Sequence, residues 1–259
     1  MSALATGTFR AALDRLGDDP GHLGVFTDFD GTLADIVADP AAAVPLPGAV
    51  DALVALAGRV ARVGVISGRP VSFLAERFPP PLVLAGLYGL ESVIDGHRAD
   101  HPAGEAWRPV VATVVELARS AGPEGMLVES KGLSLTLHYR QHPERAAEVQ
   151  AWARRQAARS GLQVRPARMS IELHPPIAVD KGSTLVEWAV GLRAACFLGD
   201  DHGDLPAFDG LDRLAAAGVA TLRVGVRSPE GDSELLARSD LVVDGPAGAL
   251  EVIRAVAAA

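Results

Sequence analysis

Short apolar runs alternate with longer segments of helical spacing along most of the chain. The apolar runs are nearly continuous, as in strands buried on both faces, and they occupy residues 23–30, 62–67, 81–86, 195–200, 220–226 and 241–245. Helical spacing follows at 47–59, where Pro47 suits a first helical turn, and at 204–218. Such alternation is typical of a parallel sheet covered by helices on both sides. The pattern therefore predicts an α/β fold with a doubly wound, Rossmann-like parallel sheet.

The middle of the chain has a different pattern. Helical spacing occurs at 105–120 and 143–161. Between and after these segments, at 126–140 and 162–175, apolar and polar residues alternate. Period-two alternation is expected of strands with one wet face, so this part predicts an inserted α+β domain. We expect a core domain at 1–100 and 178–259 and the inserted domain at 101–177. Polar or proline-rich stretches at 95–105 and 174–182 are candidate hinges.

Composition narrows the class of protein. The 259 residues are 49% hydrophobic and 22% charged, an ordinary globular balance that excludes a largely disordered chain. The net charge of −8 argues against a nucleic-acid partner. No run reaches the roughly 18 apolar residues of a membrane span, and the first 19 residues read as an amphipathic helix without a signal-peptide core. The single cysteine, Cys196, excludes a disulfide framework, so we expect a cytoplasmic protein with no membrane partner.

Arginine greatly outnumbers lysine among the basic residues. Of the 24 lysines and arginines, only Lys131 and Lys181 are lysines, and asparagine is absent. A coding bias that favours arginine explains the scarcity of lysine but not where the two remaining lysines lie.

The strongest chemical signal is the stretch from Asp28 to Thr32, which follows an apolar strand directly. Two carboxylates, Asp28 and Asp30, stand two residues apart at the strand end, where open α/β sheets bind ligands, and Gly31 permits a tight turn. Paired carboxylates favour a divalent metal, and oxygen-only ligands favour magnesium. One carboxylate can attack phosphorus while the other moves a proton. A plain turn or capping role is the alternative.

Three further signals follow in order. Ser67, Gly68 and Arg69 end the second strand, although this triplet alone would also serve as a helix cap. Lys181 precedes a predicted helix, where a positive charge opposes the helix dipole unless an anion lies nearby. Asp200, Asp201 and Asp204 follow a later strand and supply a second acidic cluster. Together these motifs resemble the haloacid-dehalogenase-like phosphatase superfamily.

Within that superfamily the chain is most similar to trehalose-6-phosphate phosphatases, over about residues 22–255. The residues that carry this resemblance are 29–36, 67–69, 86–91, Glu129 to Gly132 with Leu137 to Arg140, and Glu172 with Asp180 to Gly182. The sequence departs from the usual pattern at three positions. Gly203 replaces a threonine, Leu205 replaces a glutamate, and His174 stands where arginine is common. These departures put the identity of the sugar in doubt.

The resemblance implies roles for individual residues. It makes Asp28 the nucleophile that forms an aspartyl-phosphate and Asp30 the general acid and base. The expected metal group for Mg²⁺ is Asp28, Asp30 through its carbonyl, Asp200, Asp201 and Asp204. The expected phosphate-binding group is Thr32, Ser67, Gly68 and Lys181, with Arg69 contacting the substrate.

The resemblance also makes the inserted domain a mobile cap that reads the sugar. Glu129, Lys131 and Glu172 are the expected sugar-binding residues, with a solvated strand-face charge as the alternative for each. Alternation leaves open whether His138 and Arg140 face the same side.

The expected function is Mg²⁺-dependent hydrolysis of trehalose 6-phosphate, with a functional link to a trehalose-phosphate synthase. The alternatives are a phosphatase for another glycosyl phosphate of the sucrose or mannosylglycerate type, a sugar phosphomutase, and a catalytically silent partner of a synthase.

Overall fold

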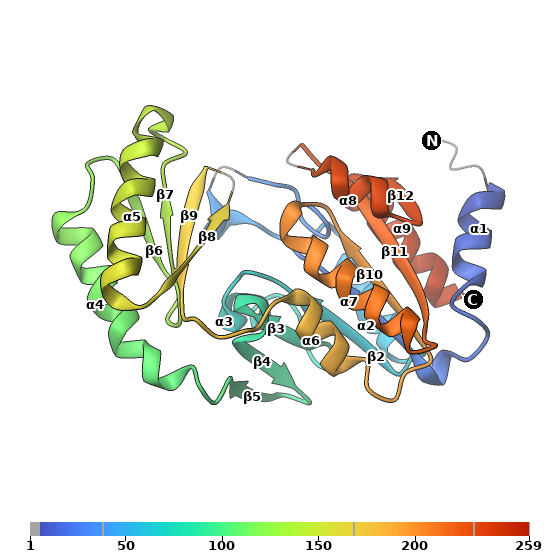
Figure 1. The fold of residues 1–259 in the computed structure, drawn as a ribbon. Helices are drawn as coiled ribbons and strands as arrows, with labels where there is room; N and C mark the ends of the chain where they lie inside the picture. Colours follow the sequence, from blue (N-terminus) through green and yellow to red (C-terminus); the bar gives the residue numbers. More distant parts are fainter. Residues whose placement is uncertain (1–5, 38, 168, 230, 259) are drawn as a thin grey trace. The chain divides into compact units, whose positions relative to one another are not determined.

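The computed structural model describes residues 6–37, 39–167, 169–229 and 231–258. The chain divides into two compact units, residues 1–99 with 179–259, and residues 100–178 (Figure 1). Each expected boundary lies one residue from the corresponding boundary of these units. The first five residues of the predicted N-terminal helix lie outside the described residues, and the helix α1 spans Thr6–Asp14.

The larger unit is built on a mixed, mainly parallel sheet with the strand order β12-β11-β10-β1-β2-β3-β4-β5. Its strands are β1 (Leu23–Thr27), β2 (Arg62–Ile66), β3 (Val83–Gly86), β4 (Glu91–Ile94), β5 (His97–Asp100), β10 (Ala194–Gly199), β11 (Ala220–Arg227) and β12 (Leu241–Asp244). The six strands from β12 to β3 run parallel, and all six were predicted. The predicted α/β class with a parallel core sheet is therefore confirmed.

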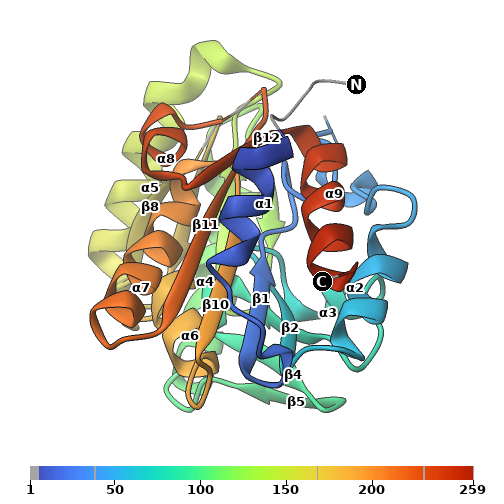
Figure 2. The ribbon, with the colours of Figure 1, turned by 90° about the vertical axis from the view of Figure 1, so that its right-hand side faces the viewer.

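Helices cover both faces of this sheet, as the near-continuous apolar strands predicted. The helices are α2 (Ala49–Ala57), α3 (Val71–Ala75), α6 (Lys181–Trp188), α7 (Leu205–Ala216), α8 (Ser233–Arg238) and α9 (Gly245–Ala258). Neighbouring residues of one strand enter opposite cores: Val25 packs with residues of α2 and α9, and Phe26 packs with residues of α6 and α7. Figure 2 shows α6 and α7 on one side of the strands and α2 and α9 on the other.

The hairpin of β4 and β5 was not predicted, because residues 91–100 are mostly polar. β4 pairs antiparallel with β3, and β5 follows at the edge of the sheet. Asp95 and Gly96 both have positive φ angles, 51° and 77°, which suits a two-residue hairpin turn. Charged edge strands are common because charge discourages pairing with another chain, so polarity here did not signal a loop.

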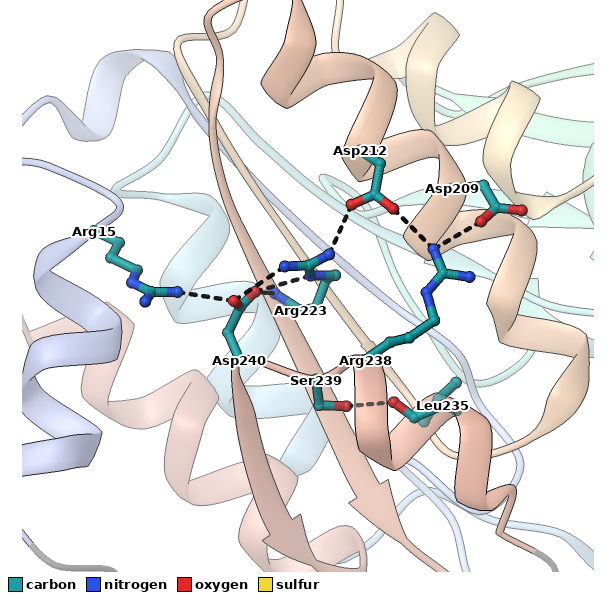
Figure 3. A network of polar contacts seen from close by, with 8 residues as sticks. All are labelled: Arg15, Asp209, Asp212, Arg223, Leu235, Arg238, Ser239 and Asp240. Carbon is teal, nitrogen blue, oxygen red and sulfur yellow. Dashed lines mark hydrogen bonds and ion pairs between the residues drawn. The ribbon is translucent and has the colours of Figure 1, made fainter.

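An ion network fixes the helices near the end of the chain (Figure 3). Arg238 of α8 contacts Asp209 and Asp212 of α7, and Arg223 of β11 contacts Asp212 and Asp240. Asp240 also pairs with Arg15, which follows α1. Isolated surface pairs contribute little, but linked pairs restrain one another's side chains. The network therefore holds α8 and the loop that follows it against α7 and β11.

The smaller unit is an antiparallel sheet with the strand order β6-β7-β9-β8 and two helices. Its elements are α4 (Arg108–Ala121), β6 (Leu127–Ser130), β7 (Leu135–His138), α5 (Ala146–Ser160), β8 (Gln163–Ala167) and β9 (Ser170–His174). Leu135 and Leu137 alternate into a core with residues of α4 and α5, as the period-two pattern predicted. Thr136 and Glu172, which lie between core positions, belong to the opposite face. No helix of the described residues is long and apolar enough to cross a membrane.

Candidate active site

The turn after β1 separates the first two carboxylates. The Asp28 N–H donates to the carbonyl of Leu198 at 2.9 Å, so Asp28 continues the sheet and its side chain is buried. Phe29 is fully buried against Phe73 and Phe78 and anchors the turn. Gly31 has a φ of 78°, and a Cβ there would clash with the carboxylate of Asp200. The backbone thus turns tightly around a second acidic residue.

Lys181 joins two carboxylates at the first position of α6. Its Nζ lies 2.8 Å from Asp28 Oδ1 and 2.6 Å from Asp204 Oδ1, and its side chain is 3% exposed. Burial alone lowers the pKa of this ammonium, but the carboxylates of Asp204 and Asp28 outweigh burial and hold the pKa above its usual value. This explains a lysine at a helix start, where the dipole opposes it. The helix is instead capped by Asp180, which accepts from Ser183 N at 2.7 Å.

Asp200 follows β10 and is held by two hydroxyls. Thr32 Oγ1 donates to its Oδ1 at 3.2 Å, and Ser228 Oγ donates to its Oδ2 at 2.6 Å. Burial, reinforced by the nearby carboxylate of Asp204, raises the pKa of Asp200 to about 8. Burial likewise raises the pKa of Asp28, with Asp204 and Asp200 adding to it and Lys181 opposing it.

Asp204 has both oxygens in use. Its Oδ1 accepts from Lys181, and its Oδ2 accepts from the N–H groups of Asp200 at 2.9 Å and Asp201 at 3.3 Å. Asp201 is exposed and accepts from Gly203 N at 2.8 Å, which closes the same turn. Asp204 therefore fixes both the lysine and the loop that carries Asp200.

Three of the five expected metal-binding residues lie together. Asp28, Asp200 and Asp204 each offer a carboxylate oxygen within 4.8 Å of the others. The carboxylates of Asp30 and Asp201 are not part of this group. Three buried carboxylates around one ammonium leave an excess of negative charge, and their donors are all oxygen, so the residues present fit Mg²⁺. A second group, His202, Asp232 and Glu234, is largely exposed, and Asp232 caps α8.

Arg69, the predicted substrate contact, is paired with Asp30 in this structure. Its Nε and Nη2 donate to the two oxygens of Asp30, each at 2.7 Å, and its guanidinium lies 4.7 Å from the ring centre of Phe73. Ser67 is buried at the end of β2, and its hydroxyl accepts from Arg69 N at 3.3 Å. The predicted triplet at 67–69 is thus a rigid turn beside the carboxylates.

A strained turn lies against this triplet. Leu87 and Tyr88 have φ angles of 49° and 64°, which are uncommon for residues with a side chain. The Tyr88 N–H donates to the carbonyl of Ser67 at 2.9 Å, and Thr184 donates to the carbonyl of Tyr88 at 3.0 Å. A Cβ at Gly68 would come within 2.7 Å of the Tyr88 hydroxyl, so a side chain there would force the Tyr88 ring to move. Backbone strain of this kind clusters at functional sites.

Two of the three expected sugar-binding residues, Glu129 and Glu172, lie on the polar face of the sheet in the smaller unit. Glu129 of β6, Thr136 of β7, Glu172 of β9 and Arg165 of β8 are direct cross-strand neighbours, and we term these four residues the polar row. His138 lies on the same face and contacts Glu129 Oε2 at 2.8 Å. Lys131 lies in the turn between β6 and β7, where its N–H donates to Ser134 O at 2.9 Å, and Arg140 is exposed beyond β7.

Ser228 is the residue of this site that the sequence did not reveal. It belongs to the loop after β11. Because β11 pairs with β10, this loop lies beside Asp200. Serine in a loop is too common to attract notice, and only the order of the strands indicates its neighbour.

Two solved structures share the fold of this chain. The C-terminal domain of the C. albicans trehalose-6-phosphate phosphatase is 21% identical, with a TM-score of 0.77 over 96% of this chain and 97% of that chain. A haloacid dehalogenase-like hydrolase from Bacteroides thetaiotaomicron is 15% identical, with a TM-score of 0.63 over 91% of this chain and 99% of that chain. The fold is that of the haloacid-dehalogenase-like hydrolases.

The family follows from the sequence comparison. The model of the trehalose-phosphatase family matches residues 26–241, and the chain belongs to that family. The trehalose-phosphate phosphatase of Mycobacterium avium is 36% identical over 243 residues, which cover 89% of this chain and 61% of that protein. The chain thus spans about half to three-fifths of the length of the curated relatives it matches.

The departures from the usual family pattern lie outside the carboxylate group. Leu205 is buried in the apolar core with Phe208, and Gly203 contributes its backbone N–H to the turn. His174 is buried at the end of β9, with Nδ1 2.9 Å from the carbonyl of Pro175.

Proposed function

We propose that this chain hydrolyses trehalose 6-phosphate to trehalose and phosphate with the help of Mg²⁺. The observation that carries the proposal is the buried bridge of Lys181 between Asp28 and Asp204, beside Asp200, in a member of the trehalose-phosphatase family. The group lies at the carboxyl ends of β1 and β10, where open α/β sheets bind ligands.

Asp28 is the proposed nucleophile. One of its oxygens bonds to phosphorus while the bond from phosphorus to the sugar oxygen breaks, and Asp30 gives that oxygen a proton. Asp30 then takes a proton from a water molecule, whose oxygen attacks phosphorus and releases Asp28. Lys181 orients Asp28 and places a compact positive charge beside the transferring group.

Asp28 and Asp200, with the backbone carbonyl of Asp30, are the residues that would hold Mg²⁺. When bound, such an ion would offset the repulsion between the Asp28 carboxylate and the phosphate dianion. Asp204 has both oxygens engaged, so its proposed role is to fix Lys181 and the Asp200 loop. Ser228 and Thr32 orient the Asp200 carboxylate. Asp201 supports the same turn, and Ser67 and Gly68 line the phosphate position.

Arg69 must release Asp30 for the first proton transfer. Both Asp30 oxygens accept hydrogen bonds from Arg69, and a guanidinium has only donors. If an Asp30 oxygen carried a proton, its O–H would point at an N–H of Arg69, and neither group could accept a hydrogen bond from the other. One of the two contacts therefore has to break before Asp30 is protonated. The guanidinium donor released in this way is proposed to bind the substrate, the role that the resemblance implies for Arg69.

The inserted unit is proposed to be a mobile cap that reads the sugar. A neutral disaccharide offers only hydroxyls, and Glu129, Lys131 and Glu172 supply charged hydrogen-bonding partners for them. Closure of such a cap would exclude water during phosphoryl transfer, and opening would release the products. The cytoplasmic location and the link to a trehalose-phosphate synthase stay predictions.

A second candidate substrate is another glycosyl phosphate, of the sucrose or mannosylglycerate type. It is favoured by Gly203 and Leu205, which depart from the usual family pattern. Phosphate release from a panel of sugar phosphates, with and without Mg²⁺, separates the two. Near-zero turnover of trehalose 6-phosphate beside a better substrate would refute the first candidate.

The same panel tests the remaining alternatives. A phosphomutase would yield isomerised hexose phosphate and little free phosphate. A catalytically silent synthase partner would release no phosphate from any member of the panel, with or without Mg²⁺.

A further inference from the structure

Thr136 occupies the middle of the inserted sheet's polar face. It is the direct neighbour of Glu129 on β6 and of Glu172 on β9. Residues directly opposite one another in antiparallel strands point to the same face, so the Thr136 hydroxyl shares a face with both carboxylates. Its chain neighbours, Leu135 and Leu137, point into the core beneath α4 and α5.

The carboxylates beside Thr136 already have partners. Glu129 contacts His138, while Glu172 accepts from Ser134 Oγ at 2.6 Å and lies 3.5 Å from Arg165 Nη1. These contacts hold each carboxylate in one orientation, and an ionised carboxylate can accept about four hydrogen bonds in all.

The Thr136 hydroxyl has no hydrogen-bond partner in the part of the chain that the structure describes. The residue is 4% exposed, and among the described residues its Oγ1 is one of two buried side-chain polar atoms without a hydrogen bond. A buried hydroxyl without a partner destabilises a fold, and each such group calls for an explanation. Valine has nearly the same shape, a high strand propensity and no such cost, so packing alone does not account for threonine here.

We propose that Thr136 is a specificity-determining residue whose hydroxyl bonds a hydroxyl of the sugar in the sugar-phosphate substrate. The inference rests on the proposed function, in which this face reads the sugar. A sugar hydroxyl both donates and accepts, and a row of carboxylate, hydroxyl and carboxylate matches this chemistry: the carboxylates accept, and Thr136 can also donate. A substrate without a sugar has nothing to offer at this position.

The test compares Thr136→Val, which removes the hydroxyl and keeps the shape, with Thr136→Ser, which keeps the hydroxyl. For trehalose 6-phosphate, we expect Thr136→Val to raise KM about three- to tenfold, the usual weight of one neutral hydrogen bond, with kcat nearly unchanged. Thr136→Ser should stay close to wild type. For p-nitrophenyl phosphate, which has no sugar, all three proteins should have the same KM.

A matched control removes another hydroxyl from the same unit. Thr113 is exposed on α4, and within the described residues its side chain hydrogen-bonds only the carbonyl of Pro109. Thr113→Val should therefore change neither KM. A Thr136→Val protein with a higher Tm and an unchanged KM for trehalose 6-phosphate would overturn the inference. It would show that the Thr136 hydroxyl forms no hydrogen bond with the sugar. Equal loss on both substrates would also overturn it, because that indicates a structural role.

Failure of the proposed function gives a different result. In that case wild type turns over p-nitrophenyl phosphate but not trehalose 6-phosphate. The comparison of Thr136→Val with wild type is then made on the best glycosyl phosphate of the panel. Equal KM values there would overturn the inference, and a raised KM for Thr136→Val alone would support it for that sugar.

Discussion

The carboxylate group of the larger unit and the polar row of the inserted unit both contain buried acidic residues, three in the first and Glu172 in the second, but they are assembled differently. Asp28, Asp200 and Lys181 come from segments far apart in the chain that meet because β1 and β10 are neighbours in the sheet. The polar row is made by register across adjacent strands. The first arrangement crowds like charges into one place, which suits a reactive phosphate and a divalent metal. The second spreads acceptors along a face, which suits a row of sugar hydroxyls.

The two lysines show the same contrast. Lys181 is buried between two carboxylates, and its removal would leave both without their counter-charge. Lys131 lies half-buried in a hairpin turn. One lysine thus lies in each unit, Lys181 in the larger and Lys131 in the inserted one. The two positions should respond differently to the same substitution.

The largest expected effect is that of Asp28→Asn in the carboxylate group. Loss of the proposed nucleophile should lower kcat about a thousandfold or more, because an amide oxygen does not form the covalent intermediate. The fold should persist with an equal or higher Tm, since the change removes one of three crowded carboxylates. Phosphate release and thermal unfolding measure the two effects. Asp51→Asn, on the exposed surface of α2, is the control, and residual activity near wild type in Asp28→Asn would contradict the mechanism.

The next effect separates the two lysines. Lys181→Met should destabilise the protein by about 3–5 kcal/mol, because Asp28 and Asp204 stay buried without their partner. Lys131→Met should change stability by less than about 0.5 kcal/mol. Urea denaturation followed by circular dichroism measures both.

Replacing each lysine by arginine, which keeps the charge, tests the same contrast if Lys181→Met does not fold. Lys181→Arg should lower kcat, because the bulkier planar group does not fit between the two carboxylates, and Lys131→Arg should mainly raise KM for the sugar phosphate. Equal behaviour of the two arginine variants would remove the distinction between the lysines.

A smaller effect is expected at the loop after β11. Ser228→Ala removes the 2.6 Å hydrogen bond to Asp200 and should weaken Mg²⁺ binding about tenfold, as loss of a ligand's orienting partner does at other metal sites. Titration calorimetry of the metal-stripped protein with Mg²⁺ measures this directly, without reference to activity. Ser228→Thr should restore most of the affinity, and Ser72→Ala, an exposed serine of α3, should leave it unchanged. An unaltered Kd in Ser228→Ala would rule out the orienting role.

The smallest effect concerns the pH response of the inserted unit. Burial, reinforced by the positive charge of Arg165, lowers the pKa of His174 below its usual value of 6.5. The unfolded chain then binds a proton more readily than the folded one, so stability is lost as pH falls below about 6.5. Tm should therefore drop more between pH 7.5 and 5.5 in wild type than in His174→Gln. The exposed His97→Gln should follow wild type, and identical slopes in all three proteins would exclude His174 as the cause.

Much of the fold could be predicted from local pattern, because apolar runs and helical spacing report burial directly. The six parallel strands were found in this way. The hairpin of β4 and β5 was missed, since an edge strand can be polar on both faces and then resembles a loop. The helix α8 was also missed, because its six residues are too few to display a helical period.

The sequence by itself determined which residues stand at strand ends, because strand ends are set by local pattern: the acidic residues after β1 and β10, Ser67 after β2, and Lys181 at a helix start. Only the tertiary structure decided their partners. Lys181 meets both Asp28 and Asp204, Arg69 meets Asp30, and Ser228 meets Asp200. The buried, unpartnered hydroxyl of Thr136 is likewise a product of register. Strand order and register bring together residues far apart in the chain, and no local pattern of polar and apolar positions specifies them.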